Sequence, residues 1–239
     1  LVFGLIGYRD EGTRRRNLSY AIVGRFDGRK FEPILRREID FGTDCYAIQA
    51  FQHADGPVGI AWAANWTDVF KDRDFHSAMT FPRRFVWQDG KLRMPPVEGV
   101  KALRTGISTE ALAAAGSVSL AGGLGEIEIE LSTPGAPFRL DFAHPDHGIA
   151  LVYDGTSLEL VFDPPGNRVV PRYLTQATAL RTVRVFVDVG LIEIYVDDGL
   201  HNATKRIDSD EPITSIAFDV DPAAVKAARL WNLRPRLGA

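Results

Sequence analysis

The sequence lacks the features that mark disulfide-rich secreted domains, helical membrane proteins and general nucleic-acid binders. Cys45 is the single cysteine among 239 residues, so no disulfide can form within the chain, and cysteine usage indicates no cellular compartment. No apolar run approaches the roughly 18 residues that a membrane-spanning helix needs. The formal net charge of −3 argues against a general affinity for nucleic acid. We therefore expect a globular protein, 45% apolar, with neither a membrane nor a nucleic acid as its partner.

The sequence also lacks an initiator methionine and a visible signal peptide, because Leu1 opens an apolar run with no basic region before it. We expect the native protein to begin upstream of Leu1. Charge is unevenly divided along the chain. There are 17 basic and 13 acidic residues up to Arg104, against 11 and 18 beyond it, so the net charge changes from +4 to −7. This change of sign predicts a domain boundary near Arg104.

Short β-prone runs between turn residues make up almost the whole chain, which predicts an all-β fold. Runs spaced by about 8–12 residues after residue 116 are typical of a β-sandwich. Only the segment 97–107 resembles a short helical linker. The predicted strands outside the central stretch are 1–8, 18–26, 31–37, 85–87, 91–94, 117–121, 126–131, 138–142, 149–153, 158–162, 182–188, 191–196, 213–218 and 228–233. The runs 85–87 and 91–94 are expected to form a hairpin around the Asp89-Gly90 turn. In the run 191–196, Ile192, Ile194 and Val196 are expected to point inward.

The central stretch, residues 39–84, contains three further β-prone runs, 39–51, 58–66 and 77–84, with polar loops between them. This pattern predicts a small antiparallel sheet. Side chains alternate between the two faces of a strand, so the middle run has two unlike faces. One face carries two indoles and the other carries only small residues, to which another layer can pack closely. The large face is Val58, Ile60, Trp62, Ala64 and Trp66, and the small face is Gly59, Ala61, Ala63 and Asn65.

Three motifs in this stretch resemble glycoside hydrolase family 32. They are Asp-Phe-Gly-Thr-Asp-Cys-Tyr-Ala-Ile-Gln from Asp40, Trp-Ala-Ala-Asn-Trp from Trp62, and Ala-Met-Thr-Phe-Pro-Arg from Ala78. The family comprises β-fructofuranosidases: invertases, levanases, inulinases and related fructosyl transferases. The resemblance implies that residues 1–96 form the last blades of a five-bladed β-propeller. It further implies a linker at 97–107 and a C-terminal β-sandwich at 108–239.

Catalysis with retention needs two carboxyl groups about 5 Å apart, a nucleophile and an acid/base. The family places them, with a stabilising Asp, in Asn-Asp-Pro-Asn-Gly, Arg-Asp-Pro and Glu-Cys-Pro, and none of these motifs occurs here. Arg73-Asp74-Phe75 matches Arg-Asp-Pro in its letters but stands where the family has no catalytic residue. We therefore expect no catalytic residue in this chain, no cofactor, and an N-terminal fragment that completes the propeller. The chain alone is expected to be inactive.

A set of substrate contacts remains, and the resemblance implies it. Asp40 matches an Asp that binds the sugar beyond the scissile bond; the alternative is a turn residue capping the loop at Gly42. Trp62 is a candidate sugar-stacking platform, with a buried core indole as the alternative. Tyr46 is expected in the pocket wall, and Asn65 is expected to bond either the substrate or the blade backbone. Thr43 stands where plant invertases carry Lys, so sucrose, levan and inulin all stay open as substrates.

Two other clusters have weaker interpretations. His144 and His147 are donor types for a metal, but no third partner stands near them in the sequence, so no metal site is predicted. The run Asp208–Glu211 lacks the ligand spacing of a calcium loop and is interpreted as a solvated turn. The competing function is a non-catalytic carbohydrate-binding β-sandwich with a remnant propeller. A related five-bladed hydrolase family is a third possibility, and it would lack the Ala-Met-Thr motif.

Overall fold

The structure is a computed structural model that describes residues 2–66, 78–106, 116–166 and 170–235. Strands dominate, and the prediction of an all-β chain is confirmed. Within the described ranges, helix is limited to three 3₁₀ segments, η1 (Glu98–Leu103), η2 (Ala121–Gly123) and η3 (Pro222–Ala224). η1 lies in the predicted linker segment. A search of the same residues finds no helix with the length and apolar character needed to cross a membrane.

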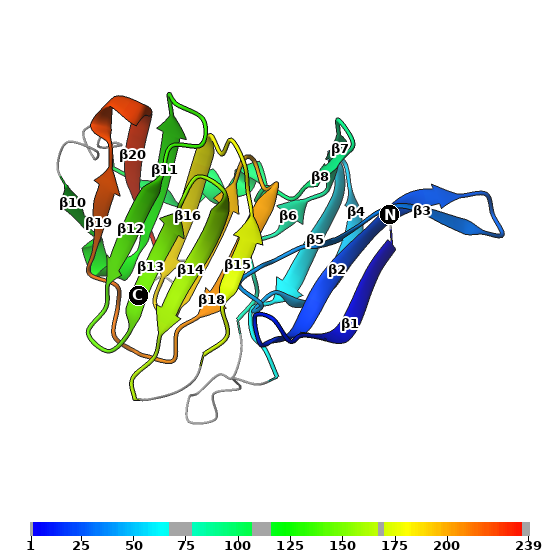
Figure 1. The fold of residues 1–239 in the computed structure, drawn as a ribbon, viewed down its shortest axis with the longest axis horizontal. Coiled ribbons are helices and arrows are strands. Elements are labelled where there is room, and N and C mark those ends of the chain that lie inside the picture. Colours follow the sequence, from blue (N-terminus) through cyan, green and yellow to red (C-terminus); the bar gives the residue numbers. More distant parts are fainter. Residues whose placement is uncertain (1, 67–77, 107–115, 167–169, 236–239) are drawn as a thin grey trace.

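The described residues up to 96 form two three-stranded sheets and one hairpin, all antiparallel. The sheets have the orders β1-β2-β3 and β4-β5-β6, and β7 pairs with β8. Figure 1 shows the β2–β3 hairpin projecting away from the rest of the molecule. The strands are β1 (Val2–Asp10), β2 (Arg15–Phe26), β3 (Phe31–Glu38), β4 (Tyr46–His53), β5 (Gly56–Trp62), β6 (Arg83–Arg84), β7 (Val86–Gln88) and β8 (Lys91–Arg93).

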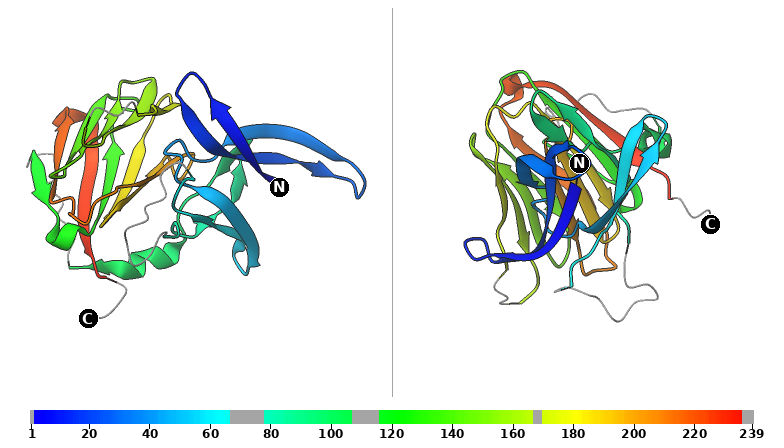
Figure 2. Two further views of the ribbon diagram at one scale, coloured as in Figure 1. Left: turned by 90° about the horizontal axis from the view of Figure 1, so that it is seen from below. Right: turned by 90° about the vertical axis from the view of Figure 1, so that its right-hand side faces the viewer.

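The remaining strands form two six-stranded antiparallel sheets that face each other (Figures 1 and 2). Their orders are β10-β19-β12-β13-β14-β15 and β18-β17-β16-β11-β20-β9. The strands are β9 (Arg104–Thr105), β10 (Ser117–Ser119), β11 (Gly125–Leu131), β12 (Phe138–Ala143), β13 (Gly148–Tyr153), β14 (Ser157–Asp163), β15 (Tyr173–Gln176), β16 (Thr182–Asp188), β17 (Leu191–Val196), β18 (His201–Arg206), β19 (Ser215–Val220) and β20 (Val225–Leu233).

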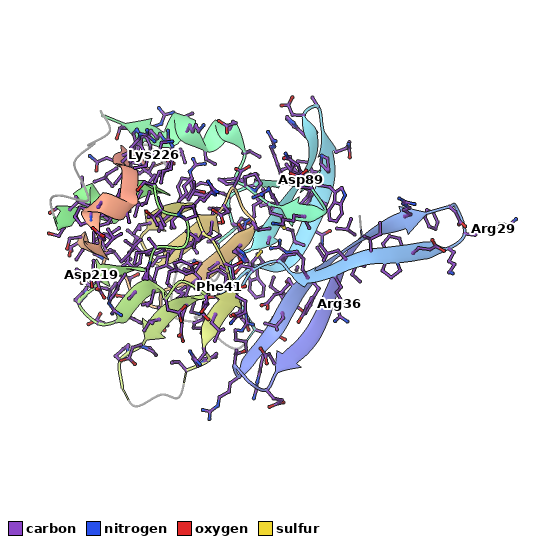
Figure 3. All side chains as sticks on the ribbon, turned by 45° about the horizontal axis from the view of Figure 1, so that its top comes forward. Arg29, Arg36, Phe41, Asp89, Asp219 and Lys226 are labelled. Carbon is purple, nitrogen blue, oxygen red and sulfur yellow. The ribbon has the colours of Figure 1, made fainter. Side chains whose placement is uncertain are left out.

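One apolar core lies between the two six-stranded sheets, because each strand alternates side chains between the core and the outside. The prediction that Ile192, Ile194 and Val196 point inward is confirmed, since all three are completely buried in this core. Phe41 also belongs to the core, although it lies far away in the sequence, and Figure 3 labels it where the two parts of the molecule meet. A smaller second core joins the sheets β1-β2-β3 and β4-β5-β6.

The predicted run 39–51 is corrected at its first half. Strand β4 begins only at Tyr46, and residues 39–45 instead cross to β18 of the second sheet. The Phe41 amide donates to the carbonyl of Asn202 at 2.8 Å, and the Asp44 amide donates to the carbonyl of Thr204 at 3.2 Å. The chain can approach so closely because residue 42 is glycine: a Cβ there would lie 2.4 Å from the Thr204 carbonyl oxygen.

Two more corrections concern strands. The predicted run 58–66 ends as a strand at Trp62, and β6 is limited to two residues of the run 77–84, of which Ser77 lies outside the described residues. The pattern also fails to predict β15 and β18. β18 was missed because its polar side chains are buried at the junction with residues 39–45 rather than alternating with apolar ones.

Candidate functional site

Three aromatic side chains gather at the end of β5. Tyr46, the first residue of β4, is the cross-strand partner of Trp62. The Tyr46 and Trp62 rings meet edge to face with their centroids 6.4 Å apart, and Trp62 meets Trp66 edge to face at 5.0 Å. Tyr46 and Trp62 are half-buried, whereas Trp66 is 64% exposed. The trio is therefore a surface feature, with two half-buried rings and one largely exposed ring.

The small face of β5 explains why the indoles lie on the opposite side. A Cβ at Gly59 would lie 2.3 Å from the Phe85 ring and 3.1 Å from Ile48, so only glycine fits. Ala61 and Ala63 are completely buried. The predicted close approach of another layer is thus confirmed, and it leaves the opposite face of β5 for Trp62.

Asn65 lies beneath the aromatic trio and is 3% exposed. Its Nδ2 donates to the carbonyls of Arg16 and Thr43, both at 3.2 Å, and its Oδ1 accepts from Asn17 Nδ2 at 3.0 Å. These contacts join the segment after β5 to strand β2 and to the loop before β4. They favour the interpretation of Asn65 as a residue bonded to the blade backbone.

The Asp40 carboxylate is buried and fully engaged with protein partners. Its Oδ1 accepts from the Gly42 amide at 3.0 Å and from the Thr204 amide at 2.8 Å. Its Oδ2 accepts from Thr204 Oγ1 at 2.7 Å and from Arg83 Nη1 at 3.0 Å. Burial raises the pKa of Asp40, and the charge of Arg83 opposes that rise. This geometry favours the alternative of a carboxylate that caps the loop at Gly42.

Arg83, the last residue of the third motif, is completely buried between two carboxylates. Besides Asp40, its guanidinium donates to Glu193 Oε2 at 3.1 Å and to Thr204 Oγ1 at 2.6 Å. Glu193 also accepts from the Phe81 amide at 2.7 Å and from the Tyr195 hydroxyl at 2.6 Å. A buried ion network therefore joins residues before 96 to strands β17 and β18.

A second buried ion pair lies beside the first. Lys205 Nζ donates to Asp44 Oδ2 at 2.7 Å, and the same oxygen accepts from the Arg206 amide at 2.8 Å. Sequence reasoning missed this pair and the network around Arg83. A recognisable sign existed at Glu193, which interrupts the apolar run of β17, because an unpaired carboxylate is rarely placed in such a strand.

The remaining candidates do not form a site in the described part of the chain. Arg73-Asp74-Phe75 lies outside the described residues. His144 and His147 meet ring to ring at 4.8 Å, but the His144 Nδ1 accepts from the Asp146 and His147 amides. In the described ranges no group of three or more His, Cys, Asp or Glu side chains is arranged to hold a metal. Cys45 is buried, and burial raises the pKa of its thiol.

Comparison with known proteins finds relatives in one family of glycoside hydrolases. The model of the family described as "Glycosyl hydrolases family 32 N-terminal domain" matches residues 1–96. A sucrose-6-phosphate hydrolase of Zymomonas mobilis is 28% identical over 98% of this chain and 51% of its own length. An extracellular exo-inulinase of Meyerozyma guilliermondii is 27% identical over 77% of this chain and 44% of its own.

The fold comparison extends over nearly the whole chain. A glycoside hydrolase family 32 structure from Bifidobacterium adolescentis superimposes with a TM-score of 0.81 and 19% identity, covering 97% of this chain and 39% of that one. The chain therefore spans about half the length, or less, of the relatives that it matches.

Proposed function

Residues 1–96 belong to glycoside hydrolase family 32, and on that premise we propose that this chain is the C-terminal portion of a retaining β-fructofuranosidase. The complete enzyme hydrolyses or transfers terminal fructosyl units of sucrose or fructans. This chain supplies walls of the sugar pocket, and its catalytic carboxylates lie upstream. Residues 1–96 correspond to the last propeller blades, 97–107 to a linker and 108–239 to a β-sandwich.

The observation that carries the proposal is the aromatic trio at the end of β5. Indole and phenol rings offer large, rigid, apolar faces, and the C–H face of a fructose ring is apolar as well. Trp62 makes edge-to-face contacts with both Tyr46 and Trp66, and these contacts restrict its ring before a ligand arrives. A preorganised platform loses little side-chain entropy on binding.

Asp40 and Asn65 enter this proposal in a different role from Trp62. Their polar atoms already bond protein groups, so we assign them to holding the loops that carry Tyr46 and Trp66. Direct sugar contact is assigned to Trp62 and Tyr46. Hydrogen bonds to the sugar hydroxyls then come from the upstream part of the pocket.

The exposed apolar side chains support the existence of that upstream part. In the described ranges eight large apolar side chains are exposed, and six of them lie before residue 96. Residues 49–53 of β4 are exposed on both faces of the strand. This concentration of exposed apolar side chains in one part of the chain suits a part against which another protein surface packs. The six are Phe26, Ile34, Phe51, Trp66, Met79 and Trp87.

The partner proposed for this surface is the N-terminal part of the same enzyme, whose blades would close the propeller. Relatives about twice as long as the aligned region have room for it. The names of these relatives include a sucrose-6-phosphate hydrolase and an exo-inulinase, so both sucrose-type and fructan substrates fall within the proposal.

The proposal is tested by substituting Trp62 in the complete enzyme. Trp62→Ala should lower kcat/KM for a fructoside about tenfold, mainly by raising KM, because an aromatic contact worth about 1.4 kcal/mol corresponds to a tenfold change. Trp231→Ala is the matched control: Trp231 lies on β20 and stacks on Arg104, four strands away from β18 in the sheet. Equal kinetics for both variants, with a lower melting temperature, would reassign Trp62 to the core. Sugar binding without any turnover by the wild type would favour the carbohydrate-binding alternative.

A further inference from the structure

Glu193 is a buried carboxylate on the outer side of β17, opposite the core between the two six-stranded sheets. Its neighbours Ile192 and Ile194 point into that core, so Glu193 faces residues 78–84 instead. It is 2% exposed and accepts three hydrogen bonds, from the Phe81 amide, Arg83 Nη2 and the Tyr195 hydroxyl. One carboxylate thus binds the segment 78–84 at both its backbone and its guanidinium.

The segment 78–84 lies directly beside Trp62. The Thr80 amide donates to the Ala61 carbonyl at 3.0 Å, and the Ala61 amide donates to Thr80 Oγ1 at 3.1 Å. The Ala63 amide donates to the Ala78 carbonyl at 2.8 Å. The residues on either side of Trp62 are therefore hydrogen-bonded to a segment that Glu193 anchors.

Tyr46, on the other side of Trp62, depends on the same ion network. Residues 40–45 lead directly into Tyr46, and Asp40 at their start binds Arg83 and Thr204. Arg83 in turn binds Glu193. Both neighbours of Trp62 are thus connected to one cluster of four buried polar side chains: Asp40, Arg83, Glu193 and Thr204.

The geometry points to Glu193 as a positioning residue for the sugar-contact site: it fixes Trp62 and Tyr46 through Arg83 and the backbone of Phe81. The second six-stranded sheet then determines pocket geometry without touching the substrate. This inference rests on the proposed function only in naming the ligand as a fructosyl group. The contacts that position Trp62 are present whatever the ligand.

A purely structural role for Glu193 makes a different prediction, which a matched carboxylate can separate. Glu126 on β11 of the same sheet is also completely buried, and it bonds Arg104 and Arg184 at 2.5–2.7 Å. In the described part of the chain its side-chain partners are Arg104 and Arg184, and neither belongs to the segment 78–84. Removing either charge leaves an arginine with fewer partners, the buried Arg83 in one case and the part-buried Arg104 and Arg184 in the other, so both substitutions should lower stability. Only Glu193 should affect Trp62.

The experiment compares Glu193→Gln, Glu193→Asp and Glu126→Gln in the complete enzyme. Glu193→Gln should raise KM for a fructoside at least tenfold with kcat changed less than threefold, because ground-state and transition-state binding lose the same platform. Glu193→Asp, which keeps the charge, should restore most of the affinity and serves as the milder variant if Glu193→Gln folds poorly. Glu126→Gln should lower the melting temperature and leave KM unchanged. Equal effects of E193Q and E126Q on KM would overturn the inference.

A second measurement separates this inference from the proposed function. In protein labelled with 5-fluorotryptophan, the ¹⁹F resonance of Trp62, assigned with Trp62→Phe, should shift in Glu193→Gln and stay in place in Glu126→Gln. A wild-type enzyme without fructoside turnover would refute the proposed function, and the resonance would still decide the positioning role. An unshifted resonance in Glu193→Gln would overturn that role even in an active enzyme.

Discussion

The guanidinium of Arg83 lies 3.0 Å from the carboxylate of Asp40, and neither side chain is reached by solvent. Arg83 ends the Ala-Met-Thr-Phe-Pro-Arg motif and Asp40 begins the Asp-Phe-Gly motif, so two of the three family motifs meet in one ion pair. Glu193 and Thr204 complete the arrangement from the six-stranded sheet. The same buried charges therefore join these two motifs to each other and to strands β17 and β18 of the six-stranded sheet.

Substituting Arg83 should be the most destabilising single change in this network. Arg83→Met leaves the carboxylates of Asp40 and Glu193 buried without their shared cation, which costs about 3–5 kcal/mol when one partner of a buried pair is removed. Urea denaturation of the wild type and the variant measures the difference in unfolding free energy. A loss below about 1 kcal/mol would mean that water or another group compensates the two carboxylates.

Asp40→Asn distinguishes the two interpretations of Asp40. The amide oxygen can still accept from the Gly42 and Thr204 amides, but the NH2 group at the place of Oδ2 cannot accept from Arg83 or Thr204 Oγ1. Those two bonds are lost, so stability should fall by about 1–3 kcal/mol. KM should rise in parallel, since the loop that carries Tyr46 shifts. A raised KM with unchanged unfolding free energy would instead favour direct contact with the sugar.

Gly42 tests the close approach of residues 39–45 to β18. Gly42→Ala places a methyl group 2.4 Å from the Thr204 carbonyl oxygen, so the loop must move away and lose its backbone hydrogen bonds to β18. Such overpacking costs about 1–3 kcal/mol. Gly99→Ala is the control, because a Cβ at Gly99 meets no atom within 4 Å. Thermal unfolding of the two variants should differ clearly, and equal melting temperatures would contradict the contact.

Protonation of His201, the first residue of β18, should make the free energy of unfolding depend on pH. Burial, with the cations of Arg37, Lys91 and Arg93 nearby and only Asp197 opposing, lowers the pKa of His201 from 6.5 to about 4. The unfolded chain then binds the proton more readily than the folded one between these values. The contribution is fully present above pH 6.5 and is lost as the pH falls toward 4, at up to about 1.4 kcal/mol per unit.

His201→Asn should remove that contribution. As the pH falls from 7.5 to 4, the unfolding free energy of the wild type should decrease relative to that of the variant, which cannot bind this proton. A constant difference across the range would show that His201 does not titrate differently in the folded and unfolded chains.

Much of the fold follows from local pattern. β17 was predicted at its true bounds because Ile192, Ile194 and Val196 alternate with residues of the other face and all bury into one core. β16 and the hairpin of β7 and β8 could also be predicted from local sequence. The β-prone residues of β16 indicate a strand, and the Asp89-Gly90 turn between two β-prone runs indicates a hairpin.

The junction between the two parts could not be predicted in this way. Asn202, Thr204 and Lys205 of β18 are nearly fully buried, yet their polar side chains resemble a solvated loop. Their burial depends on partners more than 150 residues away, such as Asp40 and Asp44. Long-range pairing of this kind produces no periodic pattern in the sequence, because the hydrogen-bond partners of these polar side chains are distant residues.

The residues of the candidate site differ in the same way: some could be placed from local sequence, and others depend on distant parts of the chain. The one-sided face of β5 indicated Trp62 and its tight backing from local sequence alone. The roles of Asp40 and Asn65 needed the structure, because the acceptors and donors around them come from loops and strands distant in the chain.

The central claim is that this chain supplies pocket walls while its catalytic carboxylates lie upstream. The most direct measurement is the hydrolysis of sucrose and inulin by residues 1–239 alone, beside the complete enzyme containing the upstream part, at equal molar concentration. The account predicts no detectable release of fructose by the chain alone and steady turnover by the complete enzyme. Turnover by residues 1–239 alone at a comparable rate would contradict it.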